Sequence, residues 1–239
     1  MRSSHVVLDQ VDAAFDDERA VANAGLLLPA TLAERLGLEQ AADELIDLGN
    51  RPGAARPGRK LLTLVHSLVA GGDCIDDVEV LRAGATASVL GHRVMAASTV
   101  GTFLRLFTFG HVRQLDRVGT AVELDADHRR HAVVELAIRD AKHGSGLRHH
   151  PSGRFFANAA WLVLVTLAHN LLRWTATLGL GTRDELVVAK TLRRTLLALP
   201  GRLTRSARRW RLHLPARWPW AHSFTMALAR LRCIPDPGG

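Results

Sequence analysis

Residues 128–142 hold the charged side chains whose spacing best fits chemistry on a phosphate group. If this segment is a helix, Glu135, Arg139 and Lys142 fall at i, i+4 and i+7, so one carboxylate and two cations share a face. Such a carboxylate can bind Mg²⁺ beside a phosphate whose charge the cations balance. Spacing alone favours a solvated helix face with an ordinary ion pair, because such pairs are common on helices.

Other clusters of ligating side chains have simpler explanations. The acids at positions 73–79 lack the spacing of a calcium loop, and acids that precede a helix ordinarily cap it. His143, His149 and His150 lie in a glycine-rich loop without nearby acids. Ser145, in the same loop, lacks the strand-to-helix context of a hydrolase nucleophile. We therefore expect helix capping from Asp73, Asp76, Asp77 and Glu79, and solvated side chains at His143, His149 and His150.

The positive charge of the chain is concentrated near its C-terminal end. Residues 186–235 hold eleven cations and no acid, so they carry +11, and since the whole chain carries +8 the other 189 residues sum to −3. A basic segment beside a near-neutral body predicts binding to DNA phosphates, although arginine that only keeps helices soluble is an open alternative. The predicted DNA-binding residues are Arg139, Arg193, Arg194, Arg202, Arg205, Arg208, Arg209 and Arg211.

Tryptophans are interleaved with these arginines. Two roles are open to these tryptophans, stacking on bases or packing in the core, and the sequence favours core packing for Trp210, Trp218 and Trp220.

Composition indicates a folded, intracellular protein. The chain has 239 residues, 47% of them hydrophobic, and only two cysteines, Cys74 and Cys233, which are far apart and lack metal-ligand spacing. The N-terminus has no apolar signal segment, so we expect a cytoplasmic, nucleoid-associated location. Residues 155–172 are long enough to cross a bilayer, but Asn158, His169 and Asn170 favour a buried core helix and no membrane contact.

Apolar periodicity predicts a mainly helical fold. Helices are expected within residues 24–48, from Lys60 to a stop at Gly71, over 98–117 with a possible break at Gly110, and over 131–142. Further helices are expected over 155–178, 184–199 and 222–231, and residues 50–59 are expected to form a loop. Alternating residues predict one or two short strands, over 121–124 and 210–214.

Six blocks of the sequence resemble, in order, successive parts of bacterial insertion-sequence transposases of the DDE type with the group 1 DDE transposase domain. The blocks are residues 15–38, 57–85, 91–117, 123–140, 152–176 and 208–220. That family carries its catalytic glutamate in a motif of tyrosine, arginine, glutamate and lysine, and the matching positions here are His128, His131, Glu135 and Lys142. The resemblance therefore assigns Glu135 as the remaining catalytic and metal-binding residue, with Lys142 beside it.

The same resemblance implies that part of the domain is missing. In the family, a ribonuclease H-like sheet with two metal-binding aspartates separates the N-terminal helical domain from the glutamate helix. Here Val118 is followed directly by Gly119, which leaves no room for that sheet, and Asp125 and Asp127 belong to the cap of the Glu135 helix. Two-metal catalysis needs convergent carboxylates around ions roughly 3.5–4 Å apart, which one glutamate cannot supply.

We therefore expect an N-terminal helical domain (1–118) and a C-terminal remnant of an interrupted ribonuclease H-like transposase domain with a basic tail (119–239). The expected function is DNA binding, at the ends of a mobile element, without cleavage, and the expected partners are DNA and an intact transposase as oligomer. The family implies Mg²⁺, but we expect this chain to bind none. The alternatives are an active metal-dependent transposase that carries out DNA transposition and recombination, and a non-functional fragment.

Overall fold

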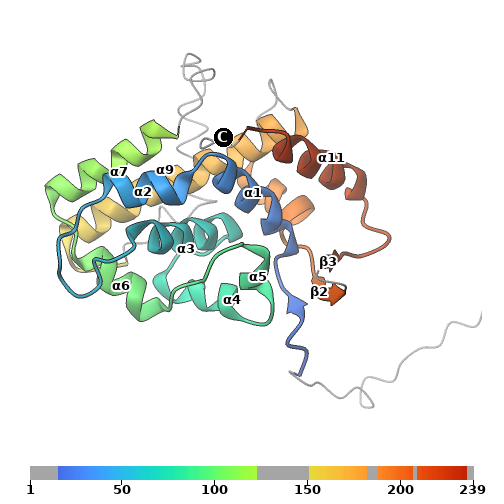
Figure 1. The fold of residues 1–239 in the computed structure, drawn as a ribbon, viewed down its shortest axis with the longest axis horizontal. Helices are drawn as coiled ribbons and strands as arrows, with labels where there is room; N and C mark the ends of the chain where they lie inside the picture. Colours follow the sequence, from blue (N-terminus) through green and yellow to red (C-terminus); the bar gives the residue numbers. More distant parts are fainter. Residues whose placement is uncertain (1–15, 123–150, 182–187, 207–208, 236–239) are drawn as a thin grey trace, which may run out of the picture.

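The chain folds into packed helices with a small three-stranded sheet at one edge (Figure 1). The computed structural model describes residues 16–122, 151–181, 188–206 and 209–235. The mainly helical prediction is confirmed. The α-helices are α1 (Leu27–Arg35), α2 (Leu38–Leu45), α3 (Pro57–Ala70), α4 (Val78–Arg82), α5 (Thr86–Val89), α6 (Ala97–Arg105), α7 (Phe109–Ala121), α9 (Phe155–Trp174), α10 (Ala189–Leu192) and α11 (Ala221–Arg232). Short 3₁₀ helices form η2 (Ala24–Leu26) and η3 (Ile75–Asp77), and π-helical segments form η5 (Thr175–Leu180) and η6 (Arg193–Leu197).

Helix α3 lies at the centre of the packing. It begins at Pro57, earlier than the sequence suggested, because proline lacks the N–H that the first helical turn leaves unpaired. It ends as predicted at Gly71, which adopts a left-handed φ of 109°. Almost all of its side chains are buried, and it packs against α2, α6 and α9.

The apolar segment that mimics a membrane span forms α9 and η5. Phe155–Leu180 is long and apolar enough to cross a bilayer, but more than half of its most apolar stretch is buried inside the protein. Leu164, Val165 and Ala168 are buried on α9, which packs against α3, α6 and α7. This is the packing expected of a core helix.

Two boundaries differ from the sequence prediction. The helix expected over 98–117 is divided into α6 and α7. Helix α7 begins at Phe109, and the side chains of Thr108, its N-cap residue, and His111 form a reciprocal cap. The prediction of a strand over 121–124 is wrong at Ala121, which is the last residue of α7. The Val122 N–H donates to the Val118 carbonyl at 3.2 Å. Helical hydrogen bonding therefore overrides the short alternating pattern.

The sheet joins a segment near the N-terminus to the C-terminal half of the chain. Strand β1 (Ala20–Val21) pairs with β2 (Gly201–Ser206), which pairs with β3 (Arg209–His213), in both cases antiparallel. The predicted strand over 210–214 is thus confirmed as β3, whereas β1 and β2 carried no clear sequence signal. Close backbone approach reinforces this edge, since the Ala24 N–H donates to the Leu199 carbonyl at 2.8 Å and a Cβ at Gly25 would lie 1.7 Å from the Leu196 oxygen.

The two predicted domains share one hydrophobic core. Their predicted boundary at residue 118 falls inside α7. Helices from the first unit pack on helices from the second, α3 and α7 on α9 and α1 on α11, and their buried residues form one cluster. In the described residues, each unit therefore covers apolar surface of the other.

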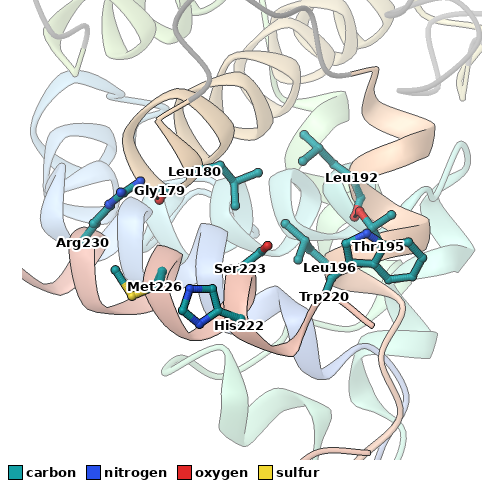
Figure 2. Close-up of a pocket in the computed structure, with 10 residues that line it drawn as sticks. All are labelled: Gly179, Leu180, Leu192, Thr195, Leu196, Trp220, His222, Ser223, Met226 and Arg230. Atoms are coloured by element: carbon teal, nitrogen blue, oxygen red, sulfur yellow. Dashed lines mark hydrogen bonds between the residues drawn. The ribbon is translucent and has the colours of Figure 1, made fainter. Parts of the chain in front are cut away.

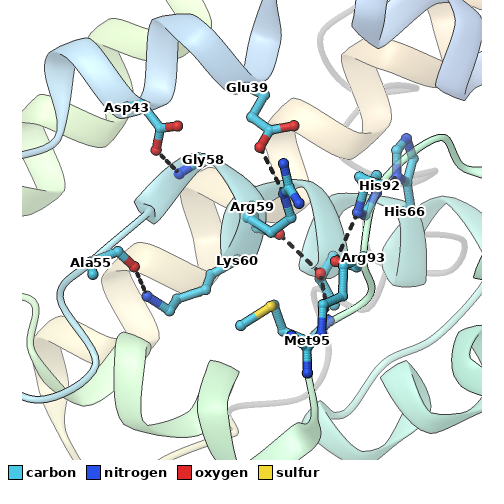
Figure 3. A network of polar contacts seen from close by, with 11 residues as sticks. Glu39, Asp43, Ala55, Gly58, Arg59, Lys60, His66, His92, Arg93 and Met95 are labelled. Atoms are coloured by element: carbon cyan, nitrogen blue, oxygen red, sulfur yellow. Dashed lines mark hydrogen bonds and ion pairs between the residues drawn. The ribbon is translucent and has the colours of Figure 1, made fainter.

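A pair of buried histidines lies beside α3. His66 Nδ1 and His92 Nε2 are 2.9 Å apart, and His92 Nδ1 lies 3.2 Å from the Arg93 carbonyl oxygen (Figure 3). The carbonyl can only accept, so His92 Nδ1 carries a proton, its Nε2 accepts, and His66 Nδ1 donates. His66 Nε2 has no partner among the described residues. The same loop is tied to α3 by the Met95 N–H, which donates to Thr63 Oγ1 at 3.2 Å.

Burial keeps this pair neutral. It lowers the pKa of His66 well below the ordinary value, and the nearby His92 lowers it further. Burial also lowers the pKa of His92, which the hydrogen bond to the Arg93 carbonyl partly counteracts. Because a histidine in the unfolded chain titrates near pH 6.5, the unfolded state binds protons first as the pH falls. The stability that depends on the neutral pair is complete above about pH 6.5 and declines below it.

Unfolding in urea at a series of pH values tests this prediction. We expect the free energy of unfolding to fall below pH 6.5 by up to about 1.4 kcal/mol per pH unit for each of the two histidines. The double variant His66→Gln/His92→Gln should lose most of this slope, whereas the exposed His222→Gln should keep it. Equal slopes in the parent and the double variant would contradict the prediction.

Candidate nucleic-acid interface

The β2–β3 hairpin gathers the basic residues of the C-terminal segment on one exposed face. Arg202 lies opposite His213, Thr204 opposite Arg211, and Ser206 opposite Arg209. Alternate residues of a strand share a face, so these six side chains point to the same side of the sheet. The three arginines and His213 are exposed. We call Arg202, Arg209, Arg211 and His213 the basic face.

The opposite face of the hairpin carries its apolar residues. Leu203 lies opposite Leu212 and is buried, which fixes the hairpin on the protein. Arg205 lies opposite Trp210, and its guanidinium carbon is 5.3 Å from the centre of the Trp210 ring. Trp210 is 60% exposed. A cation over an exposed aromatic ring leaves the other side of the ring open to a planar group.

The core-packing prediction for the tryptophans is wrong for Trp210 and Trp220, which are both exposed. Trp218 is half-buried, and its Nε1–H donates to the Thr195 carbonyl at 2.7 Å. The difference arises because β3 places Trp210 opposite Arg205, where the other described residues leave most of its side chain exposed. Trp218 instead joins the segment after β3 to η6.

Arg193 and Arg194 are neighbours in sequence with different environments. The Arg193 guanidinium donates from Nε to the Val69 carbonyl and from Nη2 to the Leu68 carbonyl, both at 2.7 Å. These carbonyls belong to the last turn of α3, where a cation also opposes the helix dipole. Arg194 is exposed. Arg193 thus links the two halves of the protein, and Arg194 stays available to solvent.

A cavity of about 410 Å³ lies between η5, η6 and α11 (Figure 2). Leu180, Leu196, Trp220 and Met226 contribute apolar walls, and Arg230 Nη1 donates to the Gly179 carbonyl at 3.2 Å. None of the described residues that line this cavity is a carboxylate, so the described lining offers no ligand set for a hard metal cation.

Several predicted site residues lie outside the described residues. They are Glu135, Arg139, Lys142 and Arg208. The structure neither brings them together nor separates them, and their roles stay predictions.

One group of metal-ligand atoms occurs in the described residues, in the N-terminal half. Single atoms of Asp73, Cys74 and Asp77 lie within 4.8 Å of one another. Asp77 Oδ2 accepts the N–H groups of Asp73 and Cys74 at 2.8 and 2.9 Å, which confirms the predicted capping role for Asp77. Burial raises the pKa of the Cys74 thiol, and its hydrogen bond to Asp77 raises it further. A protonated thiol beside a cap is a poor metal ligand.

The comparisons with known proteins address the C-terminal half. A family model described as transposase DDE domain group 1 matches residues 111–236. The chain belongs to this family of DDE transposases. Searches of curated proteins and of solved structures gave no match. The matched region begins in α7 and includes α9, the hairpin and α11, so the basic face belongs to the transposase domain.

The described part of the transposase domain does not fit the divalent metals that the family implies. From residue 111 to 235, the described residues hold one carboxylate, Asp116, which is exposed on α7. Asp73 and Asp77 lie outside the family match. Since a two-metal centre needs several convergent carboxylates, we derive no catalytic step through a metal from these residues.

The contrast between Arg193 and Arg194 yields a stability prediction. Arg193→Gln should lower the free energy of unfolding by roughly 1.5–3 kcal/mol, since hydrogen bonds to a charged group are lost near buried carbonyls. Arg194→Gln removes the same charge from an exposed site and should change stability by less than about 0.5 kcal/mol. Urea unfolding of both variants measures the difference. Equal losses would show that Arg193 does not cap α3.

Proposed function

We propose that this DDE transposase family member binds DNA through the basic face of the β2–β3 hairpin and does not cleave it. The observation that carries the proposal is the exposure of Arg202, Arg209 and Arg211 on one side of two strands that are paired through their backbones. Alternate residues on a strand are roughly 7 Å apart, so the face offers a row of cations to a phosphate backbone.

The charge around the hairpin supports this proposal. The described residues from 188 to 235 include ten lysine and arginine residues and no aspartate or glutamate. A positively charged surface attracts the DNA phosphates from a distance, and added salt weakens that attraction by screening the charges. The exposed Trp210 beside Arg205 adds a ring on which a sugar or base can pack.

The second part of the proposal is that the catalytic centre is absent. Helix α7 runs without interruption through residues 118 and 119, where the aspartate-bearing sheet of an intact relative would be inserted. Glu135 is the one residue that the family motif assigns to the catalytic triad here. A single carboxylate does not hold two metal ions in the geometry of phosphoryl transfer.

The proposal implies a role at the ends of a mobile element of the insertion-sequence type, inside the cell and alongside an intact transposase that supplies catalysis. The competing possibilities are an active transposase and a non-functional fragment. Cleavage assays distinguish the first from our proposal, and a cooperative unfolding transition of the purified protein argues against the second.

Salt-dependent DNA binding tests the basic face. Arg209→Gln/Arg211→Gln should weaken duplex binding and reduce the slope of log K against log salt by about two, since each lost phosphate contact contributes roughly 0.9. The matched control Arg93→Gln/Arg117→Gln removes two exposed arginines away from the hairpin. It should leave the slope nearly unchanged. Equal slopes for parent and hairpin variant would rule out this face.

A cleavage assay tests the missing centre. We expect no strand cleavage by the parent with Mg²⁺ or Mn²⁺ on supercoiled DNA that carries terminal inverted repeats, and no difference for Glu135→Gln. A family member with all three carboxylates serves as the positive control. Cleavage by the parent that is lost in Glu135→Gln would show that other residues replace the missing aspartates.

A further inference from the structure

The N-terminal end of the described chain places an acidic turn beside the basic face. Residues 16–18 are Asp16, Asp17 and Glu18, and all three are exposed. The exposed Arg19 separates them from β1, in which Ala20 lies opposite Arg202 of β2. The Leu203 N–H donates to the Arg19 carbonyl at 3.0 Å. Backbone hydrogen bonds therefore hold three acids at the edge of the hairpin.

The Asp17 carboxylate is fixed by one oxygen and faces the basic face with the other. Its Oδ1 accepts the Arg19 N–H at 2.9 Å, and its Oδ2 lies 3.7 Å from Arg202 Nε. The side chains of Arg202 and Asp17 are 59% and 48% exposed. The ion pair is therefore open to solvent, and a phosphate can approach the same guanidinium.

This turn is also anchored to the N-terminal helices. The Ala20 carbonyl accepts the Ala85 N–H at 2.9 Å, at a point where Gly84, with φ of 56°, allows close approach. The acids consequently keep their place relative to the hairpin through contacts on both sides of β1.

Arg202 is the residue that the acidic turn and the proposed DNA site have in common. Its side chain shares the outward face with Arg209 and Arg211, according to the pairing of β2 with β3. A phosphate that contacts this face meets the Asp17 carboxylate at Arg202, and the neighbouring Asp16 and Glu18 add negative charge that Arg19 only partly offsets.

We propose that residues 16–18 act as an internal competitor of DNA. In the free protein Asp17 occupies Arg202 and lowers the affinity of the basic face, and bound DNA displaces it. This inference rests on the proposed DNA binding by the hairpin. Exposed ion pairs are weak, so the competitor reduces affinity by about 1.5- to 5-fold and is overcome by DNA that contacts several arginines.

The central test is a cycle of Asp17→Asn and Arg202→Gln, measured by duplex DNA binding at low salt. Asparagine retains the oxygen that accepts the Arg19 N–H and removes the charge. Asp17→Asn should strengthen binding by about 1.5- to 5-fold, and it should have no effect when Arg202 is already glutamine. The gain should shrink as salt screens the charges.

A second variant separates local competition from net charge. Asp16→Asn/Asp17→Asn/Glu18→Gln should bind DNA more tightly than Asp17→Asn. The control Glu44→Gln/Asp76→Asn/Asp116→Asn makes the same change in net charge at exposed sites of α2, η3 and α7. It should strengthen binding much less. Asp16→Asn/Glu18→Gln, which keeps Asp17, should strengthen DNA binding less than Asp17→Asn does. Thermal unfolding of each variant verifies that the fold is retained.

Three outcomes would overturn the inference. They are no gain from Asp17→Asn, an equal gain in the Arg202→Gln background, and an equal gain from the control variant. Failure of the proposed function gives a different pattern, because Arg209→Gln/Arg211→Gln would then leave DNA binding unchanged.

Discussion

The packing of α3 against α9 is the contact on which the rest of the structure depends. The two helices belong to different halves of the chain, and most of the side chains of α3 and half of those of α9 are buried. Without the contact, each helix would expose a large apolar surface to water. Burying them together excludes water from Leu64 and Leu68 on one helix and Leu164 on the other. The family domain is therefore completed by the N-terminal helices, which supply the surface that covers α9.

Polar groups make this apolar contact specific. Arg193 joins η6 to the last carbonyls of α3, and the His66–His92 pair joins α3 to the loop before α6. Leaving such buried groups without partners would cost more than their hydrogen bonds contribute, so they disfavour alternative packings of the same apolar faces. They also place η6, and with it β2, at a defined position.

The DNA binding that we propose for this protein and the cleavage that we propose it has lost depend on different elements. The basic face is held by strand pairing with β1 and by the burial of Leu203, neither of which requires the aspartate-bearing sheet of an intact transposase. A carboxylate centre, in contrast, needs residues from several strands to converge within a few ångströms. On our proposal, the loss of that sheet removes the means to break a phosphodiester and leaves the phosphate-binding surface in place.

The sequence by itself determined the helical class, the stop of α3 at Gly71, the strand β3 and the family, because these depend on local periodicity, glycine geometry and ordered motifs. Only the tertiary structure decided which arginines face solvent. Arg193 and Arg194 are indistinguishable in sequence, yet the Arg193 guanidinium donates hydrogen bonds to the last carbonyls of α3 and Arg194 is exposed. Likewise, the two-residue β1 became visible only through its pairing with β2, since contacts between residues 180 or more positions apart leave no local pattern in the sequence.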